Sequence, residues 1–114
     1  MKQKLEIFFK PKSIAVVGAS KDSRKIGNAA LKNILISDYE CKVYPINPHE
    51  KEILGLKCYK KVQKVPEEID LVLISVPAKI VPTVLKDCKE KNVKNVIIIS
   101  SGFSEVGKNE LEDE

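Results

Sequence analysis

The 114-residue sequence contains no tryptophan and has only three tyrosines and three phenylalanines. Its net charge is +4, and basic residues are mixed with acidic ones along the chain instead of forming one block. Proteins that bind nucleic acids usually combine a concentrated basic stripe with aromatic side chains on which bases stack. The sequence therefore argues against a nucleic-acid partner, and its modest positive surplus favours a small polyanionic ligand.

Cysteine and histidine are also scarce. Cys41, Cys58 and Cys88 are far apart in the sequence and form no CxxC pair, and His49 is the single histidine. Zinc sites need closely spaced Cys or His ligands, so no metal site is expected. We interpret the cysteines as reduced thiols, with Cys88 in the core, and His49 as a surface residue in a turn.

Long apolar runs are missing as well. No segment approaches the about 20 apolar residues that span a membrane, and the first residues lack the apolar core of a signal peptide. A cytoplasmic protein without a membrane partner is therefore expected. Apolar residues still make up 43% of the chain and charged residues 32%, which is typical of a globular protein. We expect residues 1–114 to form a single domain.

Apolar segments of strand type alternate with amphipathic segments of helix type. Strands are predicted at residues 14–17, 41–46, 55–59, 70–76 and 95–100, and helices at residues 26–36 and 80–91. In the second helix, Val81, Leu85 and Cys88 are expected to face inward, and Asn92 is expected to end the helix. This alternation predicts an α/β fold, a Rossmann-like doubly wound parallel sheet with five strands in the order 3-2-1-4-5.

The predicted first strand runs into the turn Gly18-Ala19-Ser20, a polar loop and the first helix. Free N–H groups and the helix dipole favour an anion at a helix N-terminus, so this turn is suited to phosphate. In open α/β sheets, ligands bind beyond the carboxyl ends of the strands. Three other strand ends carry residues that let a ligand approach the backbone: Asn47 and Pro48; Val76, Pro77 and Ala78; Ser100, Ser101 and Gly102.

Two common nucleotide-binding motifs are absent from this turn. The pattern GxxxxGK[ST] does not fit, because Gly18 and Gly27 are nine residues apart and no lysine follows Gly27. The pattern GxGxxG does not fit, because Ser20 stands in place of its second glycine. NAD-binding domains also place a carboxylate at the end of the second strand, where this chain has Asn47 with Lys51 close behind. NAD is therefore disfavoured, whereas NADP stays open.

Several segments of the chain occur together, in this order, in one known family. They are Ile14-Ala15-Val16-Val17-Gly18-Ala19-Ser20, Ile26-Gly27-Asn28, Tyr44-Pro45-Ile46-Asn47-Pro48, Glu52-Ile53-Leu54-Gly55-Leu56-Lys57-Cys58-Tyr59, Ile69-Asp70-Leu71-Val72, Val76-Pro77-Ala78 and Ser100-Ser101-Gly102-Phe103-Ser104-Glu105-Val106-Gly107. The chain resembles the CoA-binding domain of ADP-forming acyl-CoA synthetases, which are relatives of the alpha subunit of succinyl-CoA synthetase. The resemblance covers nearly the whole chain after about Phe8.

The resemblance implies that coenzyme A is the ligand, and it assigns residues to parts of that ligand. The residues implied for the phosphates are Gly18, Ala19, Ser20 and Lys21, with Gly27 beside them. Those implied for the nucleotide end are Asn47, Pro48 and Lys51. Those implied for the pantetheine arm are Val76, Pro77, Ala78, Ser100, Ser101 and Gly102. Arg24 and Lys25 would add charge near the diphosphate or lie in a solvated loop.

No catalytic residue is expected in this chain, because the phosphorylated histidine of the family lies in a later domain and His49 is not its counterpart. The resemblance implies the N-terminal CoA-binding domain of a longer ADP-forming acetate–CoA or acyl-CoA ligase. Its expected partners are coenzyme A and further synthetase domains or subunits, with a second copy of the chain also open. Two alternatives remain: a free-standing, non-enzymatic CoA-binding or CoA-sensing module, and an NAD(P)-binding domain.

Overall fold

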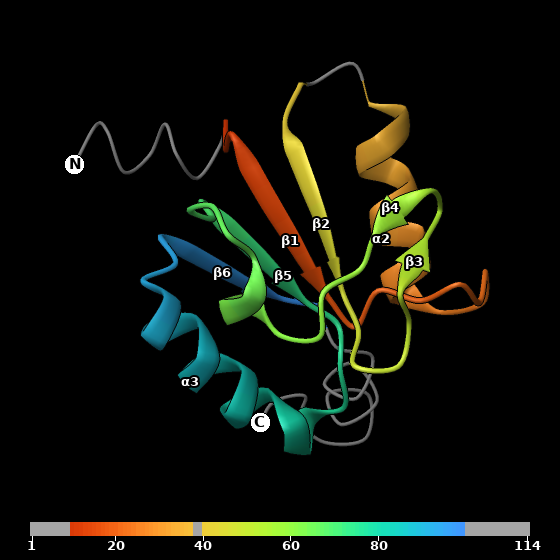
Figure 1. Ribbon diagram of the computed structural model, residues 1–114. Coiled ribbons are helices and arrows are strands. Elements are labelled where there is room, and N and C mark those ends of the chain that lie inside the picture. Colours follow the sequence, from red (N-terminus) through yellow and green to blue (C-terminus); the bar gives the residue numbers. More distant parts are fainter. Residues whose placement is uncertain (1–9, 38–39, 100–114) are drawn as a thin grey trace.

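The computed structural model describes residues 10–37 and 40–99 of the chain. Its centre is a parallel sheet of four strands in the order β2-β1-β5-β6 (Figure 1). The strands are β1 (Ser13–Val17), β2 (Lys42–Ile46), β5 (Leu71–Ile74) and β6 (Asn95–Ile98). The order reverses at β1, which pairs with β2 on one side and with β5 on the other. The α/β class and the parallel sheet are therefore confirmed.

All five residues of β1 are buried, and alternate residues point to opposite faces of the sheet. Ala15 and Val17 pack in the cluster formed with helix α3 (Val81–Lys91). Ile14 and Val16 pack in the cluster formed with helix α2 (Ile26–Ile36). One helix thus covers each face of the sheet (Figure 1), which explains why these strands are apolar at consecutive positions.

Both predicted helices are present, and α3 is preceded by the short 3-10 helix η2 (Ala78–Ile80). Asn92 adopts a left-handed conformation with φ of 63° and ends α3, as expected. The buried face of α3 is Val81, Val84 and Cys88, and Leu85 is 40% exposed. The inward orientation expected for Leu85 was wrong. The helix face that meets the sheet runs from Val81 to Val84 and then to Cys88, and Leu85 lies beside this face. No helix in the described ranges is long and apolar enough to cross a membrane.

The prediction of a fifth strand at residues 55–59 is not met in the described residues. This part of the chain contains an antiparallel pair, β3 (Glu52–Ile53) and β4 (Leu56–Lys57). Leu54 and Gly55 join the two strands with positive φ angles of 52° and 81°, as a tight hairpin turn of this kind requires. The order 3-2-1-4-5 is thereby corrected to a four-stranded sheet with a separate hairpin beside it.

Only one residue of the expected fifth strand pairs with the edge of β2. Tyr59 donates its N–H to the Pro45 oxygen and accepts from the Asn47 N–H, both at 2.9 Å. In a parallel ladder the next donor along that edge would be the nitrogen of residue 45, and proline has no N–H. The ladder therefore ends after a single bridge, and β4 pairs with β3 instead.

Candidate functional site

A cleft of about 730 Å³ opens at the carboxyl ends of β1, β2 and β5. This is the place where strand order reverses, and in open α/β sheets ligands bind there. Its walls come from the first turn, the start of α2, the segments after β2 and β5, and one face of α3. The lining residues are Val17, Gly18, Ser20, Lys25, Ile26, Gly27, Ile46, Asn47, Pro48, His49, Lys60, Lys61, Val62, Ser75, Val76, Pro77, Ala78, Ile80, Thr83, Val84 and Asp87.

Two glycines let three backbone segments meet at the floor of this cleft. Gly18 has a φ of +90°, and a Cβ placed on it would lie 2.0 Å from the Ser75 oxygen at the end of β5. A Cβ on Gly27 would lie 2.0 Å from the Gly18 oxygen. Any side chain at either position would push the first turn away from β5 or from the start of α2. The glycines therefore allow these three backbone segments to pack closely where they line the cleft.

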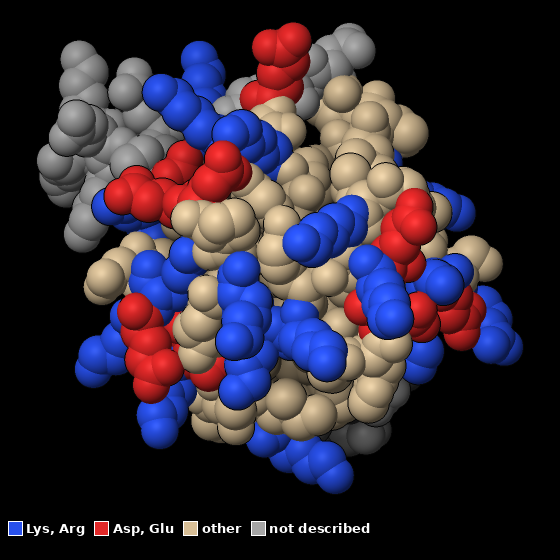
Figure 2. Space-filling view, viewed as in Figure 1, with Lys and Arg blue, Asp and Glu red and all other residues tan. Residues whose placement is uncertain are grey.

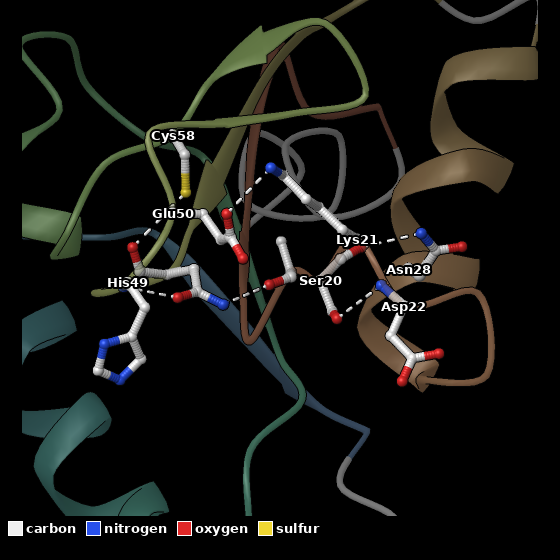
Figure 3. A network of polar contacts seen from close by, with 9 residues as sticks. Ser20, Lys21, Asp22, Asn28, His49, Glu50 and Cys58 are labelled. Carbon is white, nitrogen blue, oxygen red and sulfur yellow. Dashed lines mark hydrogen bonds and ion pairs between the residues drawn. The ribbon is translucent and has the colours of Figure 1, made fainter.

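Two asparagines hold the carbonyl groups of the same turn. Asn28 is 2% exposed, and its Nδ2 donates to the Ser20 oxygen at 2.9 Å. Asn47 Nδ2 donates to the Ala19 oxygen at 2.9 Å, and its Oδ1 accepts from the His49 N–H at 2.8 Å (Figure 3). Both carbonyl oxygens, which would repel an anion, are thus engaged by donors. Asn47 joins the first turn to the loop after β2.

Ion pairs engage two of the basic residues expected near the phosphates. Lys21 Nζ lies 3.2 Å from Glu50 Oε1, which links the two loops (Figure 3). Arg24 donates from Nε and Nη2 to the two carboxylate oxygens of Asp22, each at 3.0 Å. The hydrogen bonds from Arg24 lower the pKa of Asp22 below its usual value. Lys21 and Arg24 are therefore directed toward carboxylates and do not line the cleft.

Three cations line the cleft: Lys25, which was expected near the diphosphate and lies at the start of α2, and Lys60 and Lys61 after the hairpin. Within the described residues, none of these three side chains takes part in an ion pair. Figure 2 shows basic side chains spread over one face of the molecule with acidic ones between them, in line with the mixed charges of the sequence. Among the basic residues that follow Gly18 closely in sequence, Lys25 thus faces the cleft whereas Lys21 and Arg24 do not, and the fold adds Lys60 and Lys61 from a distant segment.

The residues implied by the resemblance fall into three groups. Those that line the cleft are Gly18, Ser20, Gly27, Asn47, Pro48, Val76, Pro77 and Ala78. Those that lie outside its lining are Ala19, which is fully buried, and Lys21, Arg24 and Lys51, which are exposed. Ser100, Ser101 and Gly102 lie outside the described residues.

Some lining residues were missed by sequence reasoning. Ile80, Thr83, Val84 and Asp87 follow helical spacing, and this pattern could have identified a second face of the predicted helix. Asn28 is a polar residue on the buried side of α2, next to Gly27 and one turn from Leu31, which is a detectable anomaly in an apolar stripe. No sequence signal could have assigned Lys60 and Lys61 to the cleft, because the hairpin determines where they lie. His49 is exposed, as expected, yet it borders the cleft.

The three cysteines lie in buried or half-buried positions. Cys58 and Cys88 are buried and Cys41 is half-buried, and all three are free thiols. Burial raises the pKa of each thiol, that of Cys88 to about 11. Cys58 Sγ donates to the Asn47 oxygen at 3.6 Å. Within the described part of the chain, no three His, Cys, Asp or Glu side chains are grouped so that they could hold a metal ion.

Comparison with known proteins identifies relatives over most of the chain. An acetate–CoA ligase (ADP-forming) of Methanocaldococcus jannaschii is 52% identical over 103 residues, which are 90% of this chain and 14% of that protein. An acetyl-coenzyme A synthetase of Ca. Korarchaeum cryptofilum, solved with phosphate and ADP, superposes with a TM-score of 0.84 at 52% identity, over 94% of this chain and 23% of that one. This chain therefore spans less than a quarter of the length of either relative.

A third relative is of similar size to this chain. A conserved hypothetical protein of Pyrococcus furiosus is 39% identical and superposes with a TM-score of 0.72, over 89% of this chain and 85% of that one. The family model described as "CoA binding domain" matches residues 12–114, a range that includes every described element of the sheet and both helices. The chain, with its glycine turn and its cleft at the strand ends, is therefore a member of the CoA-binding domain family.

Proposed function

We propose that this chain binds coenzyme A in the cleft and does so as the CoA-binding domain of an ADP-forming acetate–CoA or acyl-CoA ligase. The observation that carries the proposal is the Gly18–Gly27 contact, which brings the first turn and the start of α2 together at the cleft floor. The ligase names of the relatives support this enzyme class. In such an enzyme this domain would hold CoA, while the acid and the nucleotide would react in other domains.

The start of α2 offers a site for the diphosphate. No side chain caps this helix, and its first turn contains no acidic residue. The N–H groups of a first turn have no partner within the helix and favour an anion together with the helix dipole. Ser20, Lys25 and Gly27 line the cleft around this end. We place the diphosphate here, with Lys21 and Arg24 near it but engaged by Glu50 and Asp22.

The remaining walls suit the two ends of the ligand. Val76, Pro77 and Ala78 follow β5 and line the cleft, and they would border the pantetheine arm together with Ser100, Ser101 and Gly102. Pro48, His49 and the face of α3 also line the cleft, and we place the adenosine against them. Lys60 and Lys61 follow Tyr59, which pairs with Asn47 beside Pro48, and both line the cleft, so they are suited to the 3′-phosphate of the ribose.

Calorimetric titration with CoA, dephospho-CoA, NAD and NADP tests the assignment of the ligand. CoA is expected to bind most tightly, because the cleft offers lysines for a third phosphate and has Asn47 where NAD sites use a carboxylate. Dephospho-CoA is expected to bind more weakly than CoA. Tighter binding of NAD than of CoA would overturn the proposal.

Replacing both Lys60 and Lys61 by alanine should weaken CoA binding more than dephospho-CoA binding, measured by the same titration at low and moderate salt. Each exposed charge pair contributes up to about 1 kcal/mol, so a loss of about tenfold for CoA is expected. Lys51→Ala is the matched control, since Lys51 is an exposed lysine outside the cleft lining. If Lys51→Ala alone discriminates between the two ligands, the 3′-phosphate lies beside the loop after β2 instead.

A free-standing CoA-binding module is the second candidate, and the Pyrococcus furiosus relative of similar length favours it. The two candidates differ in the part of the gene downstream of residue 114. A downstream domain that carries the phosphorylated histidine supports the ligase, and a stop codon shortly after residue 114 supports the module. CoA binding by the chain itself is expected in both cases.

A further inference from the structure

One face of α3 forms a wall of the cleft, and it carries a single charged residue. The α3-side residues that line the cleft are Ile80, Thr83, Val84 and Asp87. Their spacings of three, four and seven residues place them on one helical face. At 1.5 Å per residue, Asp87 lies about 10 Å along the helix axis from Ile80. Asp87 therefore lies about two helical turns beyond the 3-10 helix η2, which follows β5.

Asp87 is the one carboxylate among the described residues that line the cleft. Its Oδ1 accepts a hydrogen bond from Gln63 Nε2 at 2.9 Å, and the same nitrogen donates to Glu90 Oε1 at 3.1 Å. Gln63 lies in the 3-10 helix η1 (Val62–Lys64), which packs against α3. The half-buried carboxylate is thus held in place by the neighbouring segment, and its Oδ2 has no partner among the described residues.

A fixed carboxylate in a cleft for a polyanion has a restricted chemistry. It repels phosphate groups and accepts hydrogen bonds but does not donate them. Coenzyme A carries one aromatic amine, the 6-amino group of its adenine, and the ribose separates this base from the diphosphate. Val84 and Ile80 lie one and two turns before Asp87 on the same face, and they offer an apolar surface for a flat base.

We propose that Asp87 is a specificity-determining residue that selects a 6-aminopurine. The base lies against Ile80 and Val84, and the free oxygen of Asp87 accepts a hydrogen bond from the exocyclic amine. Hypoxanthine held in the same pose would place its 6-oxygen against the carboxylate and be repelled. This inference rests on the proposed function, because it assumes that the cleft holds coenzyme A.

The test compares the dissociation constants of CoA and of the CoA analogue in which hypoxanthine replaces adenine. The unsubstituted chain should prefer CoA by about tenfold or more, the size of a hydrogen bond to a charged group. In Asp87→Asn the amide can accept from an amine or donate to an oxygen, so the ratio of the two constants should approach one. Glu90→Gln is the matched control, because Glu90 shares the Gln63 contact but does not line the cleft.

The outcomes of this test separate the two proposals. An unsubstituted chain that binds both ligands equally, or an Asp87→Asn chain that keeps the full preference for CoA, overturns the role of Asp87 and leaves CoA binding intact. The same loss of preference in Glu90→Gln also overturns it. A chain that binds no CoA at all overturns the proposed function, and the role of Asp87 with it. If Asp87→Asn does not fold, the preference of the unsubstituted chain still decides.

Discussion

Gly18→Ala is expected to lower the free energy of unfolding by at least about 3 kcal/mol, a large share of the stability of a small domain. The new Cβ would lie 2.0 Å from the Ser75 oxygen, and the backbone φ of +90° is unfavourable for any L side chain. The contact is with backbone, so no side-chain rotation relieves it. Moving Ser75 would also strain the hydrogen bond from its N–H to the Val17 oxygen, which is 2.8 Å long. Urea denaturation followed by circular dichroism measures the effect.

Two other glycines separate the causes of this loss. Gly27→Ala introduces only the close contact, since a Cβ there would lie 2.0 Å from the Gly18 oxygen. Gly55→Ala introduces only the unfavourable φ of +81°, with no atom within 4 Å of the new Cβ, and should cost about 1–2 kcal/mol. The expected order of losses is Gly18 largest, then Gly27, then Gly55. A Gly55→Ala chain less stable than Gly18→Ala would contradict the packing role of the cleft floor.

Asn47→Asp is expected to weaken CoA binding by about tenfold or more and to lower the melting temperature. The side chain would lose its donor to the Ala19 oxygen and place a carboxylate against that carbonyl group, with a cost of about 1–3 kcal/mol. The carboxylate would also stand at the edge of the cleft expected to hold phosphates. Calorimetric titration with CoA and a thermal melt of the free chain measure the two effects.

Acid should reduce the stability defect of this variant. The carbonyl oxygen beside the introduced carboxyl raises its pKa in the folded state above the unfolded value of about 3.9. The protonated acid can again donate to the Ala19 oxygen, so the stability defect should be small below about pH 4 and grow as the pH rises through the raised pKa.

Asn33→Asp is the control for Asn47→Asp, because it adds the same charge at an exposed position of α2. Equal losses of CoA affinity in the two variants would show that overall charge, not the Ala19 contact, is responsible.

The glycine variants test the folding stability of the cleft region, and the asparagine variants test the surface that the cleft presents to a ligand. Gly18 and Gly27 permit the first turn, β5 and α2 to touch, and the expected consequence of changing them is a loss of folding stability. Asn28 and Asn47 hold the carbonyl groups of the turn, so changing them alters the surface presented to a ligand. Lys60, Lys61 and Asp87 border the cleft and are expected to affect affinity and selectivity with little effect on folding.

Sequence alone determined the α/β class, the positions of both helices and the four central strands. These features depend on local patterns: apolar β-branched runs, helical spacing and the punctuation by Gly18, Pro77 and Asn92. It also determined the family, because the motifs lie at strand ends and in a fixed order. The same patterns did not determine the fifth strand. Leu54-Gly55 turns residues 56–57 back onto residues 52–53, and Pro45 lacks the N–H that would extend the ladder with the distant segment at Tyr59.

Only the tertiary structure decided which side chains face the cleft. Lys21 and Arg24 are adjacent to the glycine turn in sequence, but Glu50 and Asp22 engage them. Lys60, Lys61 and Asp87 are far from it in sequence, but the hairpin and α3 bring them to the cleft. Asn47 takes part in the first turn through a contact across 28 residues. The positions of helices and strands along the chain follow from local sequence patterns. The charged and hydrogen-bonding groups of the cleft depend on contacts that form only when the chain is folded.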